Sequence, residues 1–136
     1  DNEVLIQEVN ALFDTGDYQR CLVLCKKGLA TKGGKDELFL NYAAVCCNHL
    51  KDGQSALRYS SRQVDVVAAE CGKKSGSFAV ALGNKVDALE LLGRLKEAHK
   101  VADEAISICR ELNYQDGLGG ALQTKAGIFF VQKVSH

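Results

Sequence analysis

The sequence predicts an all-α protein in which antiparallel helix pairs stack in a row as an α-solenoid. Three observations lead to this prediction. The chain of 136 residues contains no proline, so only glycine and short polar clusters interrupt it. Between these interruptions, apolar residues recur three and four positions apart, which is the spacing of one face of an amphipathic helix. The interruptions are fairly evenly spaced, which indicates an internal repeat.

The first two helices form the clearest pair. They are expected at residues 2–14 and 18–31, and they end at a Thr-Gly-Asp turn and a Lys-Gly-Gly turn. Their apolar faces consist of Val4, Leu5, Val9, Leu12 and Phe13 in the first helix and of Leu22, Val23, Cys25 and Leu29 in the second. Each apolar face needs a neighbouring helix to cover it.

Five more helices are expected along the chain. The third and fourth lie at 36–50 and 54–71, on either side of a Lys-Asp-Gly turn. The fifth and sixth lie at 75–92 and 95–112, with a Gly-Arg turn between them, and the seventh lies at 116–133. No segment alternates with period two for long enough to form a strand, so no sheet is expected.

One turn pattern recurs three times. Gly-Asp-Tyr-Gln-Arg-Cys at 16–21 is the clearest copy, and it is followed by Lys-Asp-Gly-Gln-Ser-Ala at 51–56 and Gly-Arg-Leu-Lys-Glu-Ala at 93–98. Each copy ends in a small residue, which allows the two helices of a pair to approach closely. The helices are therefore expected to form repeated pairs.

Further residues recur at equivalent positions of successive units. They are Leu5, Glu8, Val9, Leu12, Cys21 and Cys25 in the first unit, Leu40, Ala43, Ala44, Cys47, Ala56 and Ser60 in the second, and Leu82, Lys85, Val86, Leu89, Ala98, Ala102 and Ala105 in the third. This pattern resembles the tetratricopeptide repeat, a helix-turn-helix unit of about 34 residues. The later units are longer, with 42 residues between the second and third turns, and are similar to those of the kinesin light chains and of spindle-orienting adaptors.

The resemblance implies a right-handed α-solenoid whose first helices line a concave groove that binds a protein or peptide partner. The chain would form a single domain with units at about 2–34, 36–72 and 75–113 and a partial unit at 116–133. The predicted partner-binding residues are Asn10, Phe13, Asn41, Tyr42, Asn48, Asn84, Asp87 and Lys125. The asparagines would clamp an extended peptide backbone, because an amide both donates and accepts hydrogen bonds.

Two alternatives stand beside this interpretation. Asparagine is also a tolerated polar residue on a solvated helix face. Phe13 and Tyr42 are also candidates for the hydrophobic core, where aromatic side chains commonly lie.

The charge of the chain narrows the class of partner. Its 17 basic and 17 acidic residues give no net charge, so nucleic acid is not an expected partner. Asp14, Asp87 and Glu90 near the groove favour a neutral or basic peptide. Related modules that hold the acidic tails of heat-shock chaperones carry cations where this chain has Ile6, Val80 and Asn84, so such a carboxylate clamp is not expected.

A second functional hypothesis is self-association, or assembly within a larger protein. The last expected helix carries an apolar stretch at 128–131 that no further helix would cap. The chain starts without methionine, so a segment of a longer protein is expected. The chain has neither a secretory signal nor an apolar run of membrane-spanning length, so a cytoplasmic location without membrane contact is expected.

Catalysis is not expected from this sequence. Cys21 and Cys25 share a helix face, and Cys46, Cys47 and His49 lie one helix further on, so a zinc site is conceivable. The chain contains no Cys-x2-Cys pair, however, and small thiols that fill the core are the preferred interpretation. The sequence therefore predicts a scaffold or adaptor with no catalytic residue, no cofactor and no metal.

Overall fold

The computed structural model describes residues 2–31, 33–34 and 36–112, and this part of the chain is all-helical, as predicted. Its helices are α1 (Asn2–Asp14), α2 (Tyr18–Thr31), α3 (Glu37–His49), α4 (Gly53–Cys71), α5 (Gly76–Leu91) and α6 (Leu95–Glu111). The six expected helices are thereby confirmed within a residue or so at each end. The seventh helix, expected at 116–133, lies outside the described residues.

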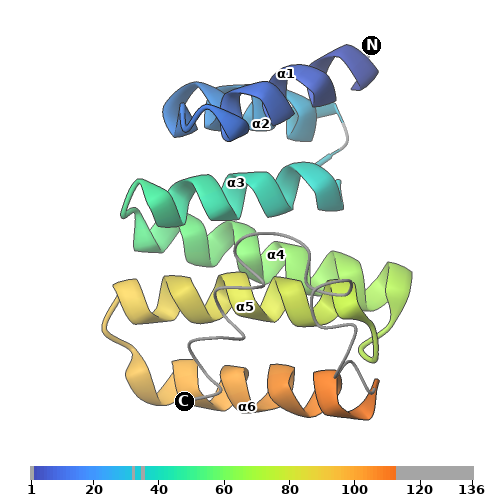
Figure 1. Cartoon of the computed structure of the whole chain (residues 1–136), viewed down its shortest axis with the longest axis vertical. Coiled ribbons are helices and arrows are strands. Elements are labelled where there is room, and N and C mark those ends of the chain that lie inside the picture. The colour runs from blue at the N-terminus through green and yellow to red at the C-terminus, as the bar shows by residue number, and fades with distance from the viewer. Residues whose placement is uncertain (1, 32, 35, 113–136) are drawn as a thin grey trace.

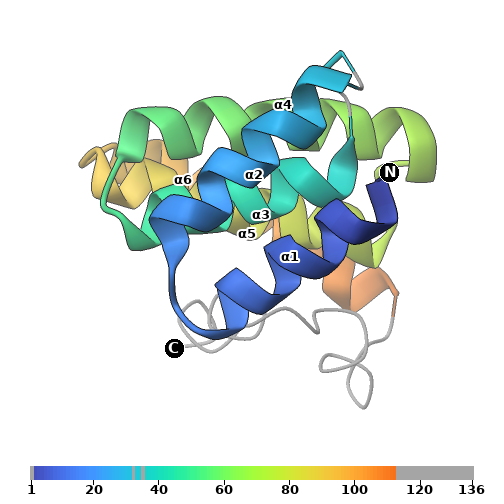
Figure 2. The ribbon, with the colours of Figure 1, turned by 90° about the horizontal axis from the view of Figure 1, so that it is seen from above.

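The helices stack in chain order, and each packs against the next (Figure 1). The first helices of successive pairs also meet, because α1 contacts α3 and α3 contacts α5. The second helices of different pairs approach one another less closely. Seen from above in Figure 2, α2 lies over α3 and α1 lies beside them. The first helices therefore form a continuous row of contacts, and we call the side of the stack that they form its inner face.

The three turns inside the helix pairs share one hydrogen-bond pattern. The backbone N–H groups of Asp17, Asp52 and Arg94 each donate to a carbonyl five residues earlier, at 2.9 Å. The residue before each of these donors has a positive φ, as expected for a Schellman helix ending. Two of these residues are glycines, but the middle one is Lys51, with φ 63°. The internal repeat is thus visible in the backbone where the residue type has changed.

The hydrophobic core consists of two clusters of buried side chains. One lies among α1 to α4 and includes Val9, Phe39 and Leu40, and the other lies among α4 to α6 and includes Phe78 and Leu89. The small residues of the repeated turn pattern are all buried, as expected for positions where paired helices cross. These residues are Cys21, Ala56 and Ala98.

Gly28 of α2 packs closely against Phe39 of α3. A Cβ atom added to this glycine would overlap the ring of Phe39, which is fully buried. The ring has little room to move, because protein interiors are packed as densely as organic crystals. A glycine in the middle of a helix is here required by the neighbouring side chain.

We predict that Gly28→Ala lowers the free energy of unfolding by about 1–3 kcal/mol, because the added methyl group overpacks the contact with Phe39. Urea unfolding followed by circular dichroism measures this change. Lys27→Ala, at the neighbouring exposed position, is the control and should change stability by less than about 0.5 kcal/mol. Adding Phe39→Leu to Gly28→Ala should recover part of the loss. A stabilising effect of Gly28→Ala would show that helix propensity outweighs packing here.

Candidate partner-binding site

The predicted site residues of the first pair gather in an aromatic cluster between α1, α2 and α3. The Phe13 ring meets the rings of Tyr18 and Tyr42 edge to face, with centroids 5.6 and 5.1 Å apart. Tyr18 also stacks on His49 at 4.1 Å. All three of Phe13, Tyr18 and Tyr42 are half-buried and pack against the core. Phe13 and Tyr42 therefore join helices together and also keep part of their surface exposed.

Asn10 is tied to this cluster by a hydrogen bond from the Tyr42 hydroxyl to its Oδ1 atom. Burial raises the pKa of Tyr42, and the nearby charge of Asp14 raises it further. The hydroxyl therefore keeps its proton and acts as the donor. Because this bond occupies Oδ1, the Nδ2 group is the part of the Asn10 amide that remains for other partners.

The predicted asparagines of α3 and α5 form a second group together with Gln63 of α4. Asn84 Nδ2 donates to Asn41 Oδ1 at 2.7 Å and to Gln63 Oε1 at 3.0 Å. Gln63 Nε2 in turn donates to Asn41 Oδ1 at 3.2 Å. The three side chains thus form a closed triangle of hydrogen bonds, which we call the amide triangle, and it joins three consecutive helices.

The amide triangle extends from the core to the inner face of the stack. Asn84 and Gln63 are fully buried, whereas Asn41 is half-buried. Asn48, two turns beyond Asn41 on α3, donates from Nδ2 to the backbone carbonyl of Asn84 at 3.3 Å. Within the described part of the chain, the Oδ1 atoms of Asn48 and Asn84 are buried without a hydrogen-bond partner.

The structure thus brings the predicted residues together in two neighbouring groups. Asn10, Phe13 and Tyr42 belong to the aromatic cluster, and Asn41, Asn48 and Asn84 belong to or adjoin the amide triangle. Asp87 is half-buried on α5. Lys125 lies outside the described residues. The direct role of each residue in binding stays a prediction.

Sequence reasoning missed Gln63, because only first helices were expected to supply the site. A signal for it exists in the sequence. Gln63 lies four residues after Tyr59 and four before Val67, and both of these residues are buried. A polar residue in the middle of an apolar stripe of a helix requires a hydrogen-bond partner in the core, and this requirement points to a buried network.

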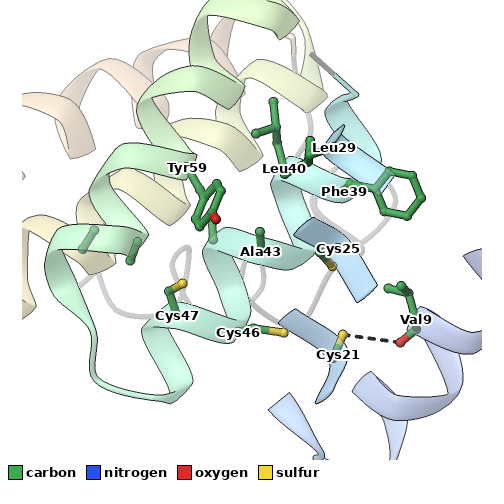
Figure 3. Packing of buried hydrophobic residues seen from close by; sticks show 13 residues of the cluster. Val9, Cys21, Cys25, Leu29, Phe39, Leu40, Ala43, Cys46, Cys47 and Tyr59 are labelled. Carbon is green, nitrogen blue, oxygen red and sulfur yellow. Dashed lines mark hydrogen bonds between the residues drawn. The ribbon is translucent and has the colours of Figure 1, made fainter. Parts of the chain in front are cut away.

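Four of the free cysteines form a thiol cluster in the core between α2 and α3, as expected. Figure 3 shows Cys46 of α3 pointing toward Cys21 of α2. Hydrogen bonds from Cys25 and Cys46 lower the pKa of Cys21, and the same bonds together with burial raise the pKa values of the two donors. The Cys21 thiol itself donates to the Val9 carbonyl at 3.5 Å, a bond that requires its proton, so we assign it as neutral. Burial raises the pKa of Cys47 to about 11.

Acidic groups prevail on the first helices. Together α1, α3 and α5 carry six Asp and Glu residues but a single Lys, and α2 carries three Lys and Arg residues and no acid. At Glu37 of α3, burial and then the charges of Glu70 of α4 and of the preceding Asp36 raise the pKa. The net charge of the chain is zero, but its acidic and basic residues are distributed unequally between the first and the second helices of the pairs.

Comparisons with known proteins leave the site to be interpreted from its geometry. No protein-family model matches the chain, and no curated protein matches it either. Among the described residues, no helix has the length and apolar character to cross a membrane, and no group of His, Cys, Asp and Glu could hold a metal ion.

We predict that Asn84→Ala lowers the free energy of unfolding by about 2 kcal/mol or more, because it leaves Gln63 Oε1 buried without a donor and opens a small cavity. Chemical denaturation measures the loss. Asn48→Ala is the matched control, since it removes one long hydrogen bond to a backbone carbonyl and should cost less than about 1 kcal/mol. Equal and small losses in both variants would mean that the amide triangle contributes little to stability.

Proposed function

We propose that this chain is a protein–protein interaction module, a scaffold or adaptor, that holds an extended peptide segment against the inner face formed by α1, α3 and α5. The observation that carries the proposal is the placement of amide side chains on consecutive helices of this face. Asn10 lies on α1, Asn41 and Asn48 lie on α3, and all three are half-buried and within reach of the surface. The right-handed, tetratricopeptide-like form of the stack belongs to the same proposal.

Amide groups suit an extended backbone better than they suit any one side chain. An extended peptide exposes N–H and C=O groups along its length, and an asparagine can pair with either. Because every residue of the ligand has these groups, amides on successive helices provide affinity that depends little on ligand sequence. The half-exposed rings of Phe13 and Tyr42 would add apolar contact beside Asn10.

The charge of the inner face supports a neutral or basic ligand. Six acidic residues and one basic residue on the first helices produce a negative potential there, which attracts cations and repels acidic peptides. Where a carboxylate clamp carries its three cations, this chain has Ile6, Val80 and Asn84. An acidic C-terminal tail would therefore find no charged partner at these positions.

The alternative is self-association or assembly within a larger protein. On the first helix pair, the large apolar side chains of Val4 and Val23 are 54% and 61% exposed. Such side chains favour burial against another molecule or another part of the same protein. The inner-face amides play no part in this alternative.

We predict that Asn41→Ala and Asn10→Ala each weaken binding of the best neutral or basic peptide from an array of random sequences by about 2- to 10-fold, the effect of one lost hydrogen bond. Fluorescence anisotropy with the labelled peptide measures the dissociation constant. Gln54→Ala, on the exposed surface of the second-layer helix α4, is the control and should leave binding unchanged.

Unchanged affinity in both asparagine variants would remove the inner face as the binding site. Circular dichroism must show wild-type helicity in all variants. A mass by light scattering that rises with protein concentration, and falls when Val4 and Val23 are replaced by Ser, would favour the self-association alternative.

A further inference from the structure

We infer that Asn41 recognises a backbone carbonyl of the bound peptide, and that Gln63 and Asn84 hold its amide in the orientation that presents N–H donors. This inference rests on the proposed function. It goes further by assigning a hydrogen-bond direction to one site residue and by assigning a positioning role to two residues behind it.

The hydrogen bonds inside the amide triangle point the oxygen of Asn41 inward. Its Oδ1 atom accepts from both Asn84 Nδ2 and Gln63 Nε2, at 2.7 and 3.2 Å. Rotating the Asn41 amide alone would place its NH2 group against these two donors. The Nδ2 group of Asn41 therefore points away from the triangle, and no acceptor in residues 2–31, 33–34 and 36–112 pairs with it.

A concerted reversal of all three amides would also give a closed triangle. In that arrangement Asn41 Nδ2 would donate inward to both Gln63 and Asn84, and Gln63 Nε2 would donate to Asn84 Oδ1. Asn41 would then present its oxygen outward and would recognise an N–H group. The direction of the whole triangle thus decides what Asn41 offers to a ligand.

Asn84 decides between the two directions. Its side chain is fully buried, and the arm of the amide outside the triangle has no partner in the described part of the chain. In the observed direction this arm is a carbonyl oxygen, and a buried oxygen without a donor is tolerated better than a buried NH2 group with two unpaired hydrogens. The reversed direction would bury exactly such an NH2 group. The observed direction, with Asn41 as donor, is therefore preferred.

The consequence for recognition is a defined polarity at one point of the peptide. The ligand must supply a carbonyl oxygen opposite Asn41, whereas its N–H group at that residue takes no part. Because the NH2 group is held by two neighbours before binding, little conformational freedom is lost when the carbonyl arrives. Gln63 and Asn84 act through Asn41 and do not touch the peptide.

The test uses the best-binding peptide from the array and backbone-modified versions of it. N-methylation removes one N–H group at a time, and reduction of one C=O to CH2 removes one carbonyl at a time. The peptide bond opposite Asn41 is found by comparing affinities. Modifying this bond should weaken binding to the wild type as much as Asn41→Ala does, and it should not weaken binding to the Asn41→Ala variant any further. At this bond, carbonyl reduction should weaken binding to the wild type at least about 3-fold, and N-methylation should have little effect.

Asn84→Asp is the variant that should reverse the preference. A carboxylate at this position can only accept, so it draws the NH2 groups of Asn41 and Gln63 inward and turns the Asn41 oxygen toward the ligand. Sensitivity should then shift from carbonyl reduction to N-methylation. Gln54→Glu makes the same change from an amide to a carboxylate on the exposed surface of α4 and should leave the wild-type preference intact.

The outcomes separate this inference from the proposed function. If Asn41→Ala weakens binding but N-methylation is the damaging modification in the wild type, the peptide site stands and the assigned polarity is wrong. If Asn84→Asp fails to fold, the wild-type peptide series alone still decides the polarity. If no peptide depends on Asn41, the proposed function fails and the inference fails with it.

Discussion

The hydrogen bonds that converge on Asn41 Oδ1 are the constraint on which the middle of this structure depends. They join α3, α4 and α5 through three side chains, two of which are fully buried. Apolar packing alone would allow neighbouring helices to slide against each other with only a modest change in energy. A buried amide that leaves its partner incurs the full cost of desolvation, so the triangle fixes the register of these helices. The inner face is consequently presented with its polar groups already in place.

The two layers of helices have different tasks. The second helices carry eight of the nine Lys and Arg residues of the six helices, whereas the first helices meet one another and carry a negative balance of charge. The buried thiols of the first two pairs belong to this packing, since small side chains allow α2 and α3 to lie close. Hydrogen bonds and burial raise the pKa values of Cys25 and Cys46, and burial raises that of Cys47, which favours the neutral form of these three thiols. Recognition of a peptide at the inner face is the function that we propose for this arrangement.

The fold was largely predictable, because local signals determine it. The turns at Gly16, Lys51 and Gly93 are each marked by polar residues and followed by a small residue, and helix boundaries followed from them. The amide triangle was not predictable, because Asn41 and Asn84 are 43 residues apart and helical periodicity does not tell which polar residue at the edge of an apolar face turns inward. Gln63 shows the same limit, although its place between Tyr59 and Val67 is a usable signal.

The most direct test of the account is the exchange of side-chain amide hydrogens with solvent, measured by NMR on the free protein. We expect the NH2 hydrogens of Asn84 to be strongly protected, because both are donated inside the triangle. At least one hydrogen of Gln63 should also be protected, and those of Asn41 should exchange rapidly. Strong protection at Asn41 together with rapid exchange at Asn84 would contradict the account, because it would mean that the triangle runs in the opposite direction or does not form.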